Sequence, residues 1–329
     1  MLHTDERSEV KPEGLAANAI RVRAMETVPT IRLLTAVDLD AAFGLSAGAG
    51  WNQRLDDWRM LLQLAPAGAF AATKDDGTIV GTAIGIDYGT FGWIAMMLVD
   101  PAWRGRGLGA RLLEAAMGAV SPGIAIRLDA TPLGRRLYRR YGFEDEDALT
   151  RHVAEPLDMA RGRPSRTAAD RTVEHLSKRV RRLTADQLPA VIETDDRIFG
   201  AHRRILLERA LDTAGQYAHA IDSDAGVQYC FGRPGRLFDQ IGPVVASDDE
   251  TAQALVGASL LAANGKAVIV DAFDRHEGFT DWLRSRGFAA SRPLFRMRRH
   301  PRDNRSAGSS DAAPRGGLAE RAILGPEFG

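Results

Sequence analysis

Apolar and polar positions alternate along the first half of the chain with two different periods. Runs typical of β-strands cover residues 30–35, 69–74, 78–86, 93–99, 124–129 and 149–153. Apolar residues at helical spacing cover residues 38–43, 53–64, 108–120 and 133–141. Because helices are interspersed among the strands, the pattern predicts an α/β fold built on a mixed sheet.

The second half of the chain repeats this order more faintly. Asp129 ends a predicted strand and is followed by Gly142 and a Phe, and the same signals recur at Asp271 and Gly287. The two Asp residues lie 142 positions apart and the two Gly residues 145 positions apart, which fits an insertion of three residues. We therefore predict a duplicated fold.

Composition divides the chain into five stretches. Residues 1–28 show no period, and residues 301–329 are rich in Arg, Ser, Gly, Asp and Ala, so a mobile N-terminal tail and a disordered C-terminal tail are predicted. A polar stretch with linker composition predicts a connection over residues 158–176. The two predicted domains are then residues 29–157 and 177–300.

The overall composition argues against several classes of protein. Of the 329 residues, 45% are hydrophobic and 26% are charged, as in ordinary globular proteins. Lys+Arg and Asp+Glu each number 43, so no excess of positive charge favours nucleic acid or an anionic membrane as a partner. The N-terminus does not resemble a signal peptide, no window approaches ~18 apolar residues, and the single Cys230 cannot form an internal disulfide. We expect a cytoplasmic protein.

A glycine-rich turn connects the strand at 93–99 to the helix at 108–120. Its residues are Arg104, Gly105, Arg106, Gly107, Leu108 and Gly109. Glycines let a ligand approach the backbone closely, and the first turn of a helix offers unpaired N–H groups at the positive end of its dipole. The turn therefore predicts an anion site, although a simple tight connection has the same composition.

Two other phosphate-binding motifs fit this turn poorly. A Walker loop requires Gly-Lys-Ser/Thr, whereas Leu108 and Ala110 follow the last two glycines. A Rossmann site places its glycine-rich turn after the first strand, whereas this one follows the fourth.

These residues resemble the GNAT superfamily of N-acetyltransferases. Its first motif, Arg/Gln-x-x-Gly-x-Gly/Ala after an apolar strand, is matched by Arg104, Gly107 and Gly109. Its second motif, a Tyr four residues before Gly-Phe, is similar to Tyr138 and Gly142. The resemblance covers roughly residues 30–155, and the repeat resembles the two-domain subfamily whose C-terminal half is degenerate.

The resemblance implies acetyl-CoA as co-substrate and requires no metal. The pyrophosphate of the coenzyme would lie on the amides of residues 104–109, and its pantetheine arm would pair with the backbone of Met97, Leu98 and Val99. A backbone amide there would stabilise negative charge on the thioester oxygen. Thr131 stands where many relatives carry an Asn that binds the cofactor.

The resemblance also assigns two catalytic candidates. Tyr138 would donate a proton to the leaving thiolate, because a phenol and a thiol have similar pKa values; its alternative is an ordinary buried aromatic. Asp129, at the end of the strand beside the coenzyme, is either the base for the incoming ammonium or the cap of the next helix.

The acceptor site is predicted from four residues. Trp51 and Asn52 lie where relatives place an acceptor-binding loop, although Asn52 also suits a helix cap. Asp87 and Tyr88 end a strand beside the cleft, although a turn role fits them too. Acidic and aromatic candidates suggest a cationic amine, such as an amino sugar or an amino-acid derivative.

The second half lacks the features of a coenzyme site. No glycine follows its strand at 240–245, and three acids, Asp248, Asp249 and Glu250, stand where a pyrophosphate would lie. We expect this half to wall the acceptor pocket or to support a homodimer. The predicted function is acetyl-CoA-dependent N-acetylation of a small primary amine. A CoA-sensing protein without turnover is the alternative, and a mycothiol-synthase-like enzyme would need an active second half.

Overall fold

The computed structural model describes residues 28–155, 168–263, 265–301 and 317–329. In the first half the strands are β1 (Thr30–Leu33), β2 (Ala69–Thr73), β3 (Ile79–Asp87), β4 (Phe91–Val99), β5 (Ala125–Ala130) and β6 (Glu144–Ala154). The helices are α1 (Leu39–Gly48), α2 (Leu55–Leu64), α3 (Leu108–Gly118) and α4 (Pro132–Arg140). Among the described residues, no helix has the length and apolar character needed to cross a membrane.

The second half follows the same order of elements. Its strands are β7 (Arg181–Arg182), β8 (His219–Ser223), β9 (Gly226–Arg233), β10 (Asp239–Ala246), β11 (Val268–Phe273), β12 (Ala289–Arg299) and β13 (Ala319–Ala322). Its helices are α5 (Ala168–Ser177), α6 (Leu188–Phe199), α7 (Arg204–Ala214), α8 (Asp249–Ala263) and α9 (Glu277–Ser285). The predicted mixed sheet and the predicted duplication are both confirmed.

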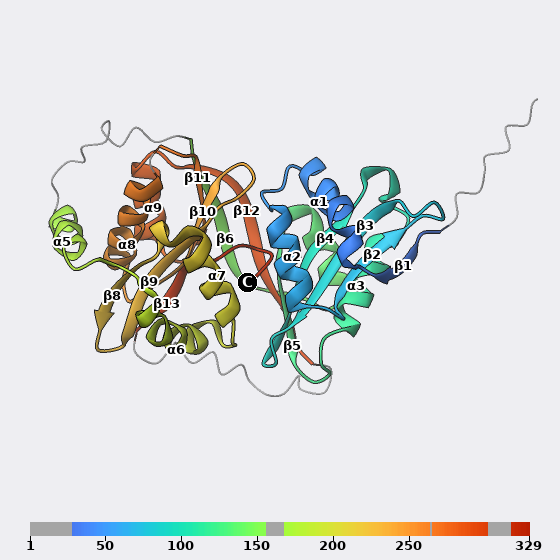
Figure 1. Cartoon of the computed structure of the whole chain (residues 1–329), viewed down its shortest axis with the longest axis horizontal. Coiled ribbons are helices and arrows are strands. Elements are labelled where there is room, and N and C mark those ends of the chain that lie inside the picture. The colour runs from blue at the N-terminus through green and yellow to red at the C-terminus, as the bar shows by residue number, and fades with distance from the viewer. Residues whose placement is uncertain (1–27, 156–167, 264, 302–316) are drawn as a thin grey trace, which may run out of the picture.

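All thirteen described strands form one sheet, in which the two halves exchange a strand. The order is β1-β2-β3-β4-β5-β12-β6-β11-β13-β10-β9-β8-β7. Strand β12 of the second half pairs with β5, and strand β6 of the first half pairs with β11. Figure 1 shows β12 and β6 crossing the middle of the molecule between the two lobes. Each half therefore completes the sheet of the other.

Two buried ion pairs of the same design join the exchanged strands. Arg296 on β12 binds both carboxylate oxygens of Asp129 on β5, at 2.9 and 3.0 Å. Arg151 on β6 binds both oxygens of Asp271 on β11, at 2.7 and 2.6 Å. The repeat relates one pair to the other, because each Asp lies directly opposite its Arg in the sheet register.

Breaking one of these pairs is expected to destabilise the fold strongly. Asp271→Ala leaves the Arg151 guanidinium buried without its counter-charge, which costs about 3–5 kcal/mol in the free energy of unfolding. Urea unfolding measures the change. Asp281→Ala, which breaks the exposed pair with Arg284, is the control and should change stability by less than about 1 kcal/mol. A loss at Asp271 no larger than in the control would contradict this assignment.

The helices of the first half cover opposite faces of its sheet. Helices α1 and α2 pack on the face that carries Trp93 and Ala95 of β4. Helices α3 and α4 pack on the face that carries Ile94 of β4 and Leu128 of β5. Strands β4 and β5 separate between these two faces of the sheet.

Two predictions about the connecting stretches need correction. The disordered tail predicted for residues 301–329 is wrong for residues 317–329, which include β13 and bury Leu318, Ile323 and Phe328. The composition of the whole stretch concealed these apolar residues at its end. Residues 168–176 of the predicted linker lie in α5. The rest of the linker, almost all of the N-terminal tail and residues 302–316 lie outside the described residues.

Candidate active site

Strands β4 and β5 diverge and open a gap in the sheet. They are paired in parallel only from Phe91 to Trp93 on β4, opposite residues 125–127 on β5. The rest of β4 keeps its pairing with β3, so its other edge faces the gap without a β5 partner. The predicted contact residues Met97, Leu98 and Val99 lie on this part of β4. The edge of β4 at the predicted contact residues Met97, Leu98 and Val99 is therefore not covered by β5.

A β-bulge shapes the edge of β4 at the gap. Met96 and Met97 together lie opposite Ala83 of β3, and Met96 has φ = +50°, a conformation that a non-glycine residue rarely adopts. The buried Thr82 hydroxyl donates a hydrogen bond of 2.8 Å to the Met96 carbonyl. Such strain persists only where surrounding contacts fix it, and it is common at active sites.

The glycine-rich turn has the geometry of an anion site. Gly105 (φ = +75°) and Gly107 (φ = +79°) adopt left-handed conformations, and a Cβ at either position would meet only open space. Gly107 is the N-cap of α3, so the amides of Leu108 and Gly109 in the first helical turn have no intrahelical acceptor.

Two arginines of this turn and the predicted ligand Thr131 have partners of their own. The Arg104 Nε donates to the carbonyl of Val99 at 3.0 Å, and the exposed Arg106 lies over the Trp103 ring at 4.8 Å. Thr131 caps α4, since its hydroxyl accepts from the Gly134 amide at 3.3 Å. Thr131 therefore has a structural role that is compatible with its predicted contact to a ligand.

Tyr138 lies on α4 within the core on the α3 side of the sheet. It is 8% exposed and packs edge-on against Phe143, with 5.9 Å between ring centroids. In the described part of the chain no group forms a hydrogen bond with its hydroxyl. Burial raises the pKa of Tyr138 above its ordinary value of 10, so the phenol keeps its proton. A neutral phenol can donate a proton, and the catalytic role stays a prediction.

Asp129 is not placed as a free base or as a helix cap. Its side chain is fully buried, and both oxygens accept from Arg296. Burial raises the pKa of Asp129, against the opposing effect of Arg296. Because Asp271 forms the equivalent pair with Arg151 in the half without a glycine-rich turn, the Asp129–Arg296 pair is explained by the strand exchange. The prediction of Asp129 as the base is corrected accordingly.

The structure also assigns other partners to three predicted acceptor ligands. The Asn52 side chain donates to the carbonyl of Phe238 at 2.9 Å and accepts from the amides of Leu237 and Phe238. The Trp51 carbonyl accepts from Arg236, in the same loop of the second half. Asp87 accepts from the Gly89 amide and from Ser121, in a turn. Asn52 and Asp87 therefore hold loops, which corrects their prediction as substrate ligands.

Tyr88 lies where segment 317–329 reaches the first half. Its hydroxyl donates to the carbonyl of Phe328 at 2.8 Å, and burial raises the pKa of its phenol. The Trp93 indole donates to the carbonyl of Pro326 at 3.1 Å. Both side chains lie on the α1 and α2 side of the sheet, together with Phe199 of α6. Figure 1 marks the end of this segment between the two lobes.

Sequence reasoning missed the buried arginines that hold this segment. Arg203 binds Asp195 at 2.8 and 2.9 Å, Glu320 at 3.1 Å and the Gly329 carbonyl at 3.1 Å. Arg233 binds Asp57 at 3.0 Å and also binds Glu327. In a chain with so many arginines, no local pattern distinguishes these two.

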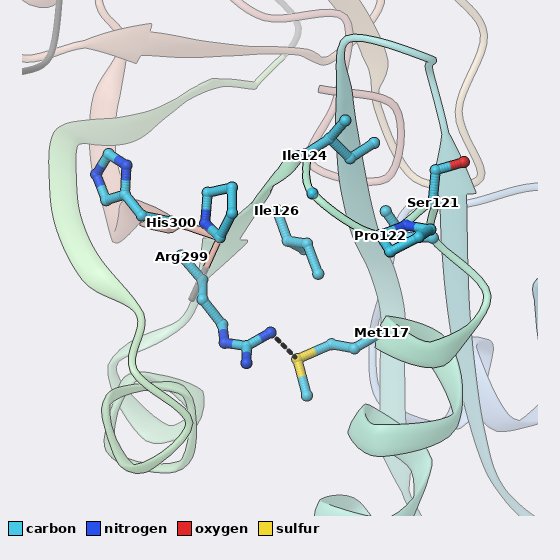
Figure 2. Close-up of a pocket in the computed structure, with 10 residues that line it drawn as sticks. Met117, Ser121, Pro122, Ile124, Ile126, Arg299 and His300 are labelled. Carbon is cyan, nitrogen blue, oxygen red and sulfur yellow. Dashed lines mark hydrogen bonds between the residues drawn. The ribbon is translucent and has the colours of Figure 1, made fainter. Parts of the chain in front are cut away.

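Two cavities among the described residues lie away from the glycine-rich turn. One of about 440 Å³ lies at the end of α3, and Figure 2 shows Arg299 reaching Met117 across it, at 3.8 Å. The glycine-rich turn lies at the other end of this eleven-residue helix, about 15 Å away. A second cavity, of about 390 Å³, lies between α2 and Arg236. Neither cavity belongs to the anion site.

No metal centre is evident in the described ranges. Among those residues, no group of three or more His, Cys, Asp or Glu side chains is placed to hold a metal ion.

Removing the Thr82 hydroxyl is expected to relax the bulge. In Thr82→Val the buried Met96 carbonyl loses its hydrogen bond, worth about 1 kcal/mol, so turnover should fall by roughly fivefold while coenzyme affinity is retained. Steady-state kinetics and calorimetry measure the two quantities. Thr82→Ser keeps the hydroxyl and should restore turnover. A serine variant as slow as the valine variant would show that the hydrogen bond is not what matters.

Comparisons with known proteins identify both halves. Two family models, each described as an acetyltransferase (GNAT) domain, match residues 66–145 and 191–308. The chain is 24% identical to the holothin acyltransferase of Pseudoalteromonas sp. over 254 residues, which cover 76% of this chain and 80% of that protein.

Solved structures share the fold over nearly the whole chain. A Pyrococcus horikoshii protein classed as an acetyltransferase superposes with a TM-score of 0.60 at 20% identity, covering 91% of this chain and 93% of that chain. A GCN5-related N-acetyltransferase from Sphaerobacter thermophilus gives a TM-score of 0.58 at 16% identity, covering 83% of this chain and 97% of that chain. These likenesses extend across both halves.

Proposed function

The chain belongs to the GNAT superfamily as a tandem N-acetyltransferase, and on this premise we propose that it transfers the acetyl group of acetyl-CoA to the primary amine of a small molecule. The reaction takes place in the first half, at the gap between β4 and β5. The observation that carries the proposal is the combination of this gap with the glycine-rich turn at the start of α3.

The residues present fit the coenzyme at both of its ends. A diphosphate suits the left-handed Gly105 and Gly107, because no side chain fills the space in front of their backbone and the α3 dipole attracts negative charge. The pantetheine arm suits the edge of β4, because a strand-like ligand can pair with main-chain groups that β5 leaves unpaired. When bound, acetyl-CoA supplies the acetyl thioester.

The residues around the gap have separate tasks in this proposal. The bulge at Met96 and Met97 presents backbone to the thioester oxygen, and Thr82 fixes that backbone. Tyr138 holds a proton for the departing thiolate, since burial keeps its phenol neutral. Asp129 and Arg296 position β5 against β12.

The acceptor approaches from the α1 and α2 side of the sheet. The coenzyme's pyrophosphate occupies the side on which α3 begins, so the other side of the gap is left for the amine. Trp93 lies there, and Arg296 stacks on it at 5.0 Å from the ring centroid. Glu320 lies 3.6 Å from Arg296 and 3.1 Å from Arg203, so its carboxylate is paired with two arginines beside Trp93.

A thiol-release assay tests the function. The enzyme is incubated with acetyl-CoA and a panel of amino sugars, amino-acid derivatives and polyamines, and acetylated products are identified by mass spectrometry. We expect amine-dependent release of CoA and an N-acetyl product. Tight coenzyme binding without turnover on any amine would favour a CoA-sensing protein instead.

A further inference from the structure

Strand β13 fills, in the second half, the place that the coenzyme gap occupies in the first. Strands β10 and β11 pair in parallel only at Asp239 and Gln240 and then separate, as β4 and β5 do. Strand β13 lies between them, pairing antiparallel with both β10 and β11. Its Ala322 is fully buried and faces Val244 on one side and Ala272 on the other.

The second half also has its own bulge, and the bulge makes room for the chain. Gly242 and Pro243 lie opposite a single residue of β9, in the register that Met96 and Met97 have in β4. A Cβ on Gly242 would lie 2.0 Å from the carbonyl oxygen of Ile323, so only glycine allows this approach. Pro243 has no backbone N–H, so the position equivalent to Met97 has lost a donor.

The acidic start of α8 has a partner on β13. The Arg321 guanidinium binds Asp249 at 2.7 Å and also contacts His276. Asp249, one of the acids that argued against a phosphate here, thus binds an arginine of the same chain. The gap, the bulge and the helix start are all adapted to a peptide strand.

From this gap the chain continues to the acceptor side of the first half. The carbonyls of Pro326 and Phe328 accept from Trp93 and Tyr88, and Gly329 packs against Phe199. Arg233 binds Glu327 and the carbonyl of Leu324, at 3.2 Å for the carbonyl. Segment 317–329 is therefore anchored in one half and covers the other.

We infer that the second half has exchanged a coenzyme site for a peptide-strand site, whose role is to hold segment 317–329 over the acceptor side of the first half. This inference rests on the proposed function. Segment 317–329 closes the amine side of the gap and keeps water from the thioester. The segment therefore determines which acceptors reach the thioester. The chain then binds one coenzyme, in its first half.

The test uses full-length protein and acetyl-CoA without any amine. Phe328→Ala removes a side chain packed in the Trp93 core, and Arg321→Ala removes the anchor at α8. We expect either change to raise water-dependent release of CoA thiol about tenfold, with acetyl-CoA affinity changed by less than about twofold. Leu260→Ala, in the second-half core and on α8, is the control for general destabilisation and should leave thiol release unchanged.

The possible outcomes separate the inference from the function. Calorimetry on the wild type should give one acetyl-CoA per chain; two sites would overturn the inference. So would thiol release that stays at the wild-type rate in both variants, or that rises equally in Leu260→Ala. No binding by the wild type would instead refute the proposed function, and the inference with it.

Discussion

Replacing Gly107 with Asp is expected to reduce acetyl-CoA affinity about a hundredfold. Gly107 has φ = +79°, where an L-residue costs roughly 1–2 kcal/mol. The new carboxylate would stand in the space proposed for the diphosphate, and two like charges at ~4 Å repel by about 1–4 kcal/mol near a protein surface. Each 1.4 kcal/mol is about tenfold in affinity. Isothermal titration calorimetry measures the change.

Gly77→Asp is the matched control for this variant. Gly77 has φ = +83° and open space at its Cβ, and it lies in the turn of the β2–β3 hairpin, outside the glycine-rich turn. The control introduces the same charge and the same backbone strain without touching the proposed anion site. If Gly107→Asp and Gly77→Asp bind acetyl-CoA with equal affinity, the coenzyme does not bind at the glycine-rich turn.

Replacing Tyr138 with Phe is expected to lower kcat about a hundredfold, the lower end of the range for general acid catalysis. The phenol has no hydrogen-bond partner among the described residues, so its removal should cost little stability. Because the ring remains packed against Phe143, coenzyme affinity should stay within about twofold of the wild type. A kcat near the wild-type value would show that Tyr138 is a core aromatic and not the proton donor.

Tyr141→Phe is the control for that substitution. Tyr141 follows α4 three residues after Tyr138, and its hydroxyl donates to Glu114 on α3 at 2.6 Å. Tyr141→Phe also removes one phenolic oxygen, from a residue that directly follows the same helix. We expect its kcat to stay within about twofold of the wild type.

The state of Tyr138 also predicts the alkaline limb of the pH profile. Burial disfavours the phenolate and raises the pKa of Tyr138 above its ordinary value of 10. The acid form therefore persists as the pH rises, and kcat should show no loss from deprotonation of the donor up to about pH 10. A fall in kcat between pH 8 and 9 that vanishes in Tyr138→Phe would contradict this state.

The sequence predicted features that depend on neighbouring residues. The glycine-rich turn and the start of α3 were found from their own residues, because turn conformation and helix capping are local. The family followed from the spacing of Arg104, Gly107 and Tyr138. The duplication followed from Asp129 and Asp271, which the structure places in equivalent ion pairs.

The failures involve partners that lie far apart in the sequence. Asn52 binds a residue 186 positions away, and Asp129 binds one 167 positions away. Both residue types suit a cap or a ligand equally well, so their local context could not reveal a partner from the other half. The order of segment 317–329 was missed for the same reason: its few apolar residues are buried only by elements of both halves.

The sequence by itself thus determined the order of elements, the duplication, the family and the conformation of the glycine-rich turn, because each depends on short-range backbone preferences and on spacing. Only the tertiary structure decided which strand completes which half, and that β13 fills the gap in the second. Those choices depend on burial and charge pairing between distant segments, which many sequences could satisfy with different partners.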